Sequence, residues 1–166
     1  MSNLPFDINK TKAILIGVSD YVEMNPIKPA IGNINDIYSI LTNPDIIGLA
    51  VSNIITILNE NHDEIYKKLR VFFKNDEDTE TLIFYYVGHG YRETSKEFYL
   101  TGINSTKDSI EVSAIPYDRL KKLIENNNIQ RRIVIIDACY SGLATQDVEG
   151  NNYTENEYGI SIGCLK

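Results

Sequence analysis

The chain of 166 residues is poor in the residues that build metal sites and disulfide frameworks. It has two cysteines and two histidines and neither a CxxC nor an HExxH motif, so we expect no disulfide framework and no zinc site. No apolar run approaches the roughly 18 residues that span a membrane, and the first residues lack the pattern of a signal peptide. We therefore expect a cytoplasmic protein without a membrane partner.

Basic residues are in the minority. Sixteen Lys and Arg stand against 23 Asp and Glu, which gives a formal net charge of -7, and no basic block is present. This balance argues against a nucleic-acid partner and favours cationic peptide segments. The length predicts a single domain over residues 1–166, with enough hydrophobic residues, 43%, for a sizeable core.

Short apolar runs alternate along the chain with helical periods. The runs predict buried strands at 12–18, 53–58, 81–87 and 131–137, a short outlying strand at 97–101 and the start of another at 159–164. The helical periods predict one helix capped by Asn33 and ended before Pro44, a second from near Asn61, and a third with Pro116 in its first turn. Such alternation predicts an α/β fold with a mostly parallel central sheet and helices on both faces.

Two reactive side chains directly follow the strongest strand signals. His89 comes after the strand at 81–87, and Cys139 comes after the strand at 131–137. Both are therefore expected at the carboxyl edge of the sheet, where ligands bind in such folds. A thiol with a pKa near 8.5 becomes a working nucleophile when an imidazole takes its proton. The backbone N–H groups of Gly90 and Cys139 are candidates for stabilising the resulting oxyanion.

A reactive cysteine with a histidine at the same sheet edge is compatible with more than one functional class. A cysteine phosphatase would need an arginine six residues after Cys139, and Thr145 stands there, so this class is excluded. A catalytically silent docking module stays open as an alternative, although the presence of both reactive residues favours an enzyme. His62 is expected to face solvent, Cys164 to be a small buried hydrophobe, and Tyr85 and Tyr86 to belong to the core.

Four segments share their pattern with a known family. They are KAILIGV at 12–18, NIND at 33–36, YYVGHG at 85–90 and DACYSG at 137–142. Together they resemble the caspase and metacaspase superfamily of cysteine peptidases, over nearly the whole chain. In caspases the histidine lies about 50 residues before the cysteine, and His89 and Cys139 have that separation. The resemblance implies the caspase fold.

The resemblance also implies roles for individual residues. It makes His89 the general base and acid, Cys139 the nucleophile and Gly90 an oxyanion donor. In metacaspase-like members, two acids hold a basic P1 side chain, and they match Asp36 and Asp137 here. Caspases proper, which cut after Asp, carry Gln at the position of Asp137. The resemblance therefore implies an endopeptidase that cleaves protein or peptide substrates after Arg or Lys.

The same resemblance also gives expectations about cofactors and partners. Calcium-dependent metacaspases carry a dense acidic cluster after the histidine, whereas residues 91–102 contain only Glu93 and Glu97. We therefore expect no cofactor and no calcium activation. The family fold continues past the cysteine, so we expect a large-subunit-like part that pairs with a small-subunit-like C-terminal part. The short loop after the histidine is similar to prokaryotic caspase-like domains, which are commonly associated with sensor or effector modules in antiviral defence and cell death.

The segment at 145–158 is polar and acidic and has no apolar period, so we expect an exposed loop. It contains no Lys or Arg, and an enzyme with a basic P1 preference would not cut itself there. The first basic residue after Cys139 is Lys166. Self-cleavage after Lys166 is one expectation, and a separately encoded second half is its alternative.

Overall fold

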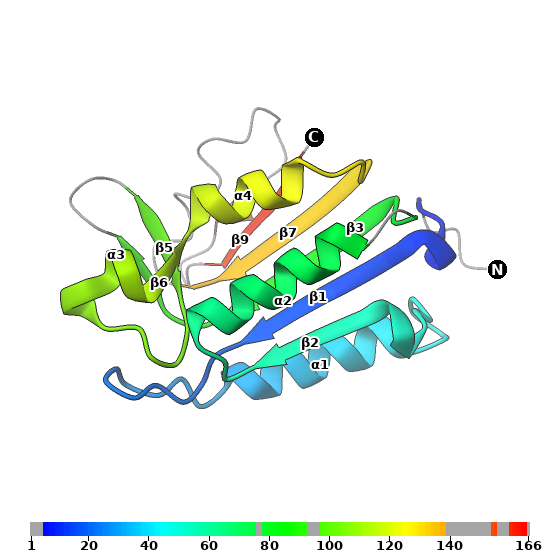
Figure 1. Ribbon diagram of the computed structural model, residues 1–166. Helices are drawn as coiled ribbons and strands as arrows, with labels where there is room; N and C mark the ends of the chain where they lie inside the picture. The colour runs from blue at the N-terminus through cyan, green and yellow to red at the C-terminus, as the bar shows by residue number, and fades with distance from the viewer. Residues whose placement is uncertain (1–4, 76–77, 93–96, 139–153, 156–159, 166) are drawn as a thin grey trace.

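The computed structural model in Figure 1 describes residues 5–75, 78–92, 97–138, 154–155 and 160–165. Its main elements are β1 (Thr11–Gly17), α1 (Ala30–Thr42), β2 (Ile54–Leu58), α2 (His62–Asn75), β3 (Thr81–Val87), β4 (Gly90–Arg92), β5 (Phe98–Thr101), α3 (Ile110–Ser113), β6 (Ala114–Pro116), α4 (Tyr117–Glu125), β7 (Arg131–Asp137), β8 (Thr154–Glu155) and β9 (Ile160–Leu165). Short 3₁₀ turns lie at Ile8–Lys10, Val51–Asn53 and Lys107–Ser109. Within these ranges, no helix has both the length and the apolar character needed to cross a membrane.

A six-stranded sheet forms the centre of the molecule. Its strand order is β2-β1-β3-β7-β9-β8, and the first four strands are parallel to one another. Strand β9 runs antiparallel to β7, and β8 runs antiparallel to β9. The two central strands pair in register from Thr81↔Arg131 to Val87↔Asp137, so β3 and β7 end side by side.

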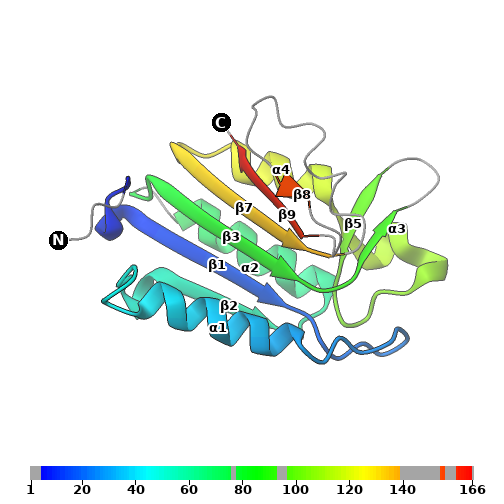
Figure 2. The ribbon, with the colours of Figure 1, turned by 180° about the vertical axis from the view of Figure 1, so that it is seen from behind.

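Helices cover both faces of this sheet, as the two opposite views show (Figures 1 and 2). Successive strand residues point to opposite faces, and the core divides accordingly. On one face, Leu15 and Tyr85 pack with α1, whereas on the other face Ile14 and Phe84 pack with α2 and α4. Because β1 and β3 are buried on both faces, they are apolar at most positions, which is why the sequence predicts them as strands.

A second, antiparallel sheet of order β4-β5-β6 lies at the end of the molecule to which the parallel strands point (Figure 1). Its first strand begins at Gly90, immediately after His89. Strand β5 pairs with β4 from Gly90↔Leu100 to Arg92↔Phe98. The chain that leaves β3 is therefore folded back over the carboxyl edge of the main sheet.

The predicted α/β architecture with a mostly parallel central sheet is confirmed. The strands expected at 81–87 and 131–137 match β3 and β7 residue for residue, and the outlying strand expected at 97–101 is β5. Asn61 precedes α2 and caps it, because its Oδ1 accepts a hydrogen bond from the Glu64 N–H at 2.9 Å.

The predicted cap at Asn33 is wrong. Helix α1 begins at Ala30, with Pro29 as its N-cap, so Asn33 lies inside the first turn. The loop expected at 145–158 lies outside the described residues except for Thr154–Glu155, which form β8.

Candidate active site

Three neighbouring strands of the main sheet end together at one edge. The N–H of Val18, just after β1, donates to the carbonyl of Val87 at 2.9 Å, and the N–H of Gly88 donates to the carbonyl of Asp137 at 3.3 Å. The sheet hydrogen bonding thus continues one residue past β1 and β3. These hydrogen bonds hold the backbone just before His89 beside the end of β7.

Gly88 makes the turn into His89 sterically possible. A Cβ atom at this position would lie 2.5 Å from the Tyr86 hydroxyl oxygen and 2.9 Å from the Tyr21 hydroxyl oxygen. Both distances are far below van der Waals contact, so a larger residue would displace these hydroxyls. The glycine before the histidine therefore allows two tyrosine side chains to approach the His89 backbone.

Hydrogen bonds hold both backbone groups of His89. Its N–H donates to the Tyr21 hydroxyl at 2.7 Å, and its carbonyl accepts from the Thr101 hydroxyl at 2.9 Å and from the Tyr86 hydroxyl at 3.0 Å. The Tyr21 and Thr101 hydroxyl oxygens lie 3.0 Å apart. Since Thr101 gives its one proton to His89, Tyr21 must donate to Thr101. A closed ring of hydrogen bonds therefore runs from the His89 N–H through two hydroxyls back to the His89 carbonyl.

Burial favours the protonated form of these tyrosines. It raises the pKa of Tyr21, which is half-buried, and raises the pKa of Tyr86, which is fully buried, well above the ordinary value. Both phenols thus remain donors over the whole range in which proteins work. The ring of hydrogen bonds does not depend on pH there.

The imidazole of His89 is oriented by a backbone carbonyl. Its Nε2 lies 2.8 Å from the carbonyl oxygen of Asn25, and its ring lies against that of Tyr21, with centroids 4.6 Å apart. A carbonyl oxygen only accepts, so Nε2 carries the hydrogen. In the neutral ring the lone pair is then on Nδ1, which is the nitrogen able to take a proton. A ring nitrogen free to accept a proton, on an imidazole oriented by a second group, is what a general base in nucleophilic catalysis requires.

The carboxyl group of Asp137 is held by two uncharged donors. Its Oδ2 accepts from the Tyr85 hydroxyl at 3.1 Å and from the Asn33 side-chain amide at 3.3 Å. Burial, and then the negative charge of Asp137, raise the pKa of Tyr85, so the phenol stays protonated and keeps donating. None of the ion pairs between described residues includes Asp137. Within the described part of the chain, its negative charge is therefore oriented without a cation beside it.

A family model described as the caspase domain matches residues 10–161. The chain belongs to the caspase-domain family. Among solved structures, it is similar to the crystal structure of the Drosophila initiator caspase Dronc, with a TM-score of 0.58 and 12% sequence identity. The match covers 78% of this chain and 56% of that chain, and at this identity it shows a shared fold. A search of curated proteins finds no match.

The structure places most of the predicted site residues of this caspase domain. His89 and Gly90 are half-buried and line a pocket of about 390 Å³, the rest of which is formed by Glu23, Met24, Asn25, Tyr91, Thr101 and Lys107. Cys139 lies outside the described residues. The last described residue before it is Ala138, which is buried one position past β7.

The two acids predicted for the P1 pocket have different surroundings. Asp137 is half-buried, whereas Asp36 is exposed on α1. The hydrogen bond from α1 to Asp137 comes from Asn33, one turn nearer the helix start. No hydrogen bond or ion pair found in the described part of the chain involves the Asp36 side chain, so its role in the pocket stays a prediction.

Two features of this region could not be foreseen from the sequence. Asn25 orients His89 through its backbone carbonyl, a group that every residue type carries. The contact of Tyr21 is the second, because nothing in its own segment links it to a histidine 68 positions away. In addition, the expectation that His62 faces solvent is wrong: its side chain is only 17% exposed, and the backbone at Asn61 and His62 packs closely against Gly102.

Proposed function

We propose that this caspase domain is the catalytic part of a cysteine endopeptidase with Cys139 as nucleophile and His89 as general base. The observation that carries the proposal is the orientation of the His89 ring: Nε2 is engaged by the Asn25 carbonyl and Nδ1 is left to accept a proton. His89 follows β3, and β7, the strand beside it, leads through Ala138 into Cys139. The proposed base and nucleophile thus each follow the end of one of two adjacent strands.

The reaction would proceed through an acyl-enzyme. Nδ1 of His89 takes the thiol proton, and the Cys139 thiolate forms a bond to the carbonyl carbon of the scissile peptide. The oxyanion would be stabilised by the N–H groups of Gly90 and Cys139. The C–N bond then breaks as His89 returns the proton to the leaving amine. Water, deprotonated by His89, attacks the thioester, releases the new carboxyl terminus and regenerates the thiol.

Cleavage after Arg or Lys is the specificity that we propose. It is supported by the Asp137 carboxylate, which lies two residues before Cys139 and is oriented by neutral donors, with no cation beside it among the described residues. A guanidinium or ammonium group would supply the missing counter-charge. Asp36, exposed on the neighbouring helix, would add a weaker attraction through water.

The remaining expectations are proposals that depend on the family resemblance. They are a small-subunit-like part that completes the substrate cleft, an associated sensor or effector module, a cytoplasmic location, activity without a cofactor, and a role in prokaryotic defence or cell death. The catalytic proposal does not depend on them, because it rests on His89 and its contacts.

Hydrolysis by the full-length protein tests the proposal. A fluorogenic peptide library with every P1 residue represented should show release after Arg or Lys. Cys139→Ala should abolish release, and Cys164→Ala, which removes the only other thiol, should not. If the parent and Cys139→Ala are equally inactive on every substrate, the catalytically silent docking module replaces the enzyme. Preferred cleavage after Asp would refute the acidic pocket.

A further inference from the structure

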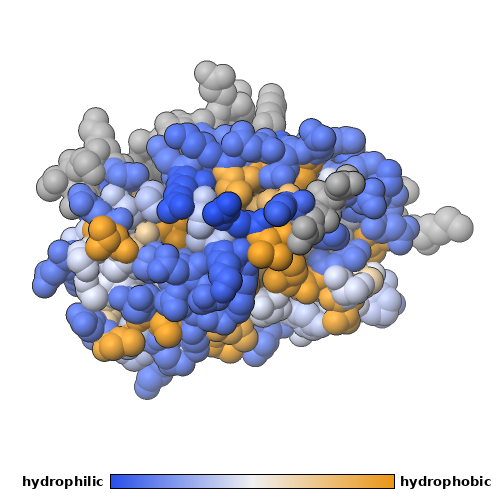
Figure 3. All heavy atoms as spheres, in the orientation of Figure 1, coloured by the Kyte–Doolittle hydropathy of each residue, from blue (hydrophilic) through white to orange (hydrophobic). Residues whose placement is uncertain are grey.

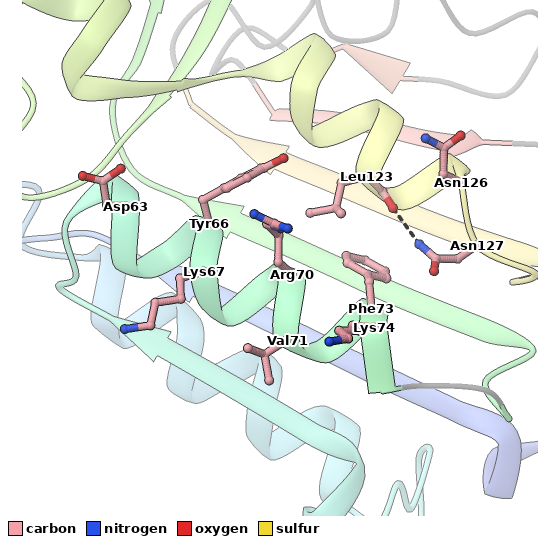
Figure 4. Close-up of a pocket in the computed structure, with 10 residues that line it drawn as sticks. All are labelled: Asp63, Tyr66, Lys67, Arg70, Val71, Phe73, Lys74, Leu123, Asn126 and Asn127. Carbon is pink, nitrogen blue, oxygen red and sulfur yellow. Dashed lines mark hydrogen bonds between the residues drawn. The ribbon is translucent and has the colours of Figure 1, made fainter.

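The face of the molecule opposite α1 carries a basic groove with an apolar floor, away from His89. Helices α2 and α4 border a hollow of about 520 Å³. Figure 4 shows Tyr66 and Phe73 of α2 and Leu123 of α4 pointing into it, with Arg70 between the two aromatic rings. Figure 3, in the orientation of Figure 1, shows hydrophobic atoms exposed here among hydrophilic ones.

A second hollow adjoins the first on the other side of α2. It has about 540 Å³ and shares Lys67 and Val71 with the first. Val71 is 55% exposed, so a large apolar side chain stands on the ridge between two concave surfaces. An apolar ridge flanked by hollows is the shape that a partner with protruding apolar side chains can bury.

The charge of this face is opposite to that of the rest of the chain. Helices α2 and α4 contain seven Lys and Arg and four Asp and Glu, a net charge of +3. The remainder contains nine basic and 19 acidic residues, a net charge of -10, which together give the -7 of the whole chain. The basic residues are therefore concentrated where the hollows lie.

Two cations of the first hollow have no counter-ion among the described residues. Lys67 is paired with Glu64 at 3.1 Å, and the Arg119 guanidinium lies over the Tyr66 ring at 4.0 Å from its centroid. No ion pair between described residues involves Arg70 or Lys74, which are both exposed. They are four positions apart on α2, so they stand one turn from each other on the same side of the helix.

We propose that this groove binds an acidic amphipathic peptide segment of a partner protein. Two carboxylates of the segment, at i and i+3 or i+4 of a helix or at i and i+2 of a strand, would reach Arg70 and Lys74. An apolar side chain between them would enter the hollow beside Phe73. A nucleic acid or an anionic membrane fits less well, because the floor is apolar, Asp63 and Glu64 lie on the rim and the chain as a whole is acidic.

Peptide selection tests this without assuming a particular partner. A random 14-residue peptide library on phage is selected against the full-length protein, and the selected peptides are measured by fluorescence anisotropy. We expect them to be rich in Asp and Glu interspersed with aromatic or aliphatic residues. Their affinity should fall at least tenfold for Arg70→Glu and for Lys74→Glu, and it should also fall as salt rises.

Lys28→Glu is the matched control. Lys28 is exposed just before α1, on the opposite face of the sheet, so the same charge change there should leave the affinity within threefold. All three substitutions are at exposed positions, and thermal melting verifies that the variants fold. If no peptide with an acidic excess is selected, or if the acidic peptides bind the α2 variants as well as the parent, the proposal is overturned. The proposal would also be overturned if the protein bound RNA or phosphatidylserine vesicles instead of peptides, and if that binding depended on Arg70.

Discussion

Replacing Asp137 by Asn removes the charge that we assign to P1 recognition while keeping the shape of the side chain. The amide oxygen can still accept from Tyr85 and from Asn33, so the local hydrogen bonding survives. Removing one partner of a desolvated charge pair costs about 2–5 kcal/mol. Because Asp137 is half-buried, we expect a cost at the lower end of this range, about 2–3 kcal/mol. A cost of this size corresponds to a loss of roughly 30- to 150-fold in kcat/KM.

Asp36→Asn, which removes the other acid predicted for the P1 pocket, is the variant to compare with Asp137→Asn. Asp36 is exposed, and two unit charges about 4 Å apart in water interact by only about 1 kcal/mol, so the loss should be about fivefold or less. The assay measures kcat/KM of the full-length variants on peptides that differ only in P1, with Arg or norleucine. The Arg peptide alone should be affected by Asp137→Asn. An equal loss on both peptides would show a structural role, and unchanged Arg cleavage would refute the assignment.

Three more expectations follow from the contacts around the histidine. Tyr21→Phe keeps the ring against His89 but removes the hydroxyl link, so kcat should fall about tenfold with KM nearly unchanged, as steady-state kinetics would show; a change in KM alone would contradict this. Gly88→Ala should lower the melting temperature by about 2–12 °C because its Cβ would collide with two tyrosine hydroxyls, whereas Gly32→Ala, with open space around it, should not. Because the folded state raises the pKa of Tyr85, it holds a proton that the unfolded chain releases near pH 10, so stability should decline as the pH rises above about 10, and urea unfolding of Tyr85→Phe should show a smaller decline.

The centre of the main sheet was predictable because β1 and β3 are buried on both faces. Residues 82–87 and 133–136 are continuous apolar runs with abrupt ends, and such runs leave little freedom in the strand boundaries. Strands β4 and β6 have only three residues each and lack an apolar run, so nothing in their own sequence marks them. They form because β5 lies between them and supplies their hydrogen-bond partners.

Parts of the candidate site were predictable for the same reason. His89 directly follows the clearest strand, which placed it at the carboxyl edge. Helix α1 has its N-cap at Pro29, four residues before the expected cap at Asn33. The first turn therefore brings Asn33 to the carboxylate, and the acid three positions later is exposed.

Covalent labelling of the full-length protein tests the central claim most directly. A peptidyl acyloxymethyl ketone with Arg at P1 reacts with an activated thiolate, and intact mass with peptide mapping identifies the labelled residue. Our account predicts one adduct on Cys139, formed at least 100-fold more slowly in His89→Ala. An adduct on Cys164, or labelling of Cys139 at the same rate with and without the His89 imidazole, would contradict it.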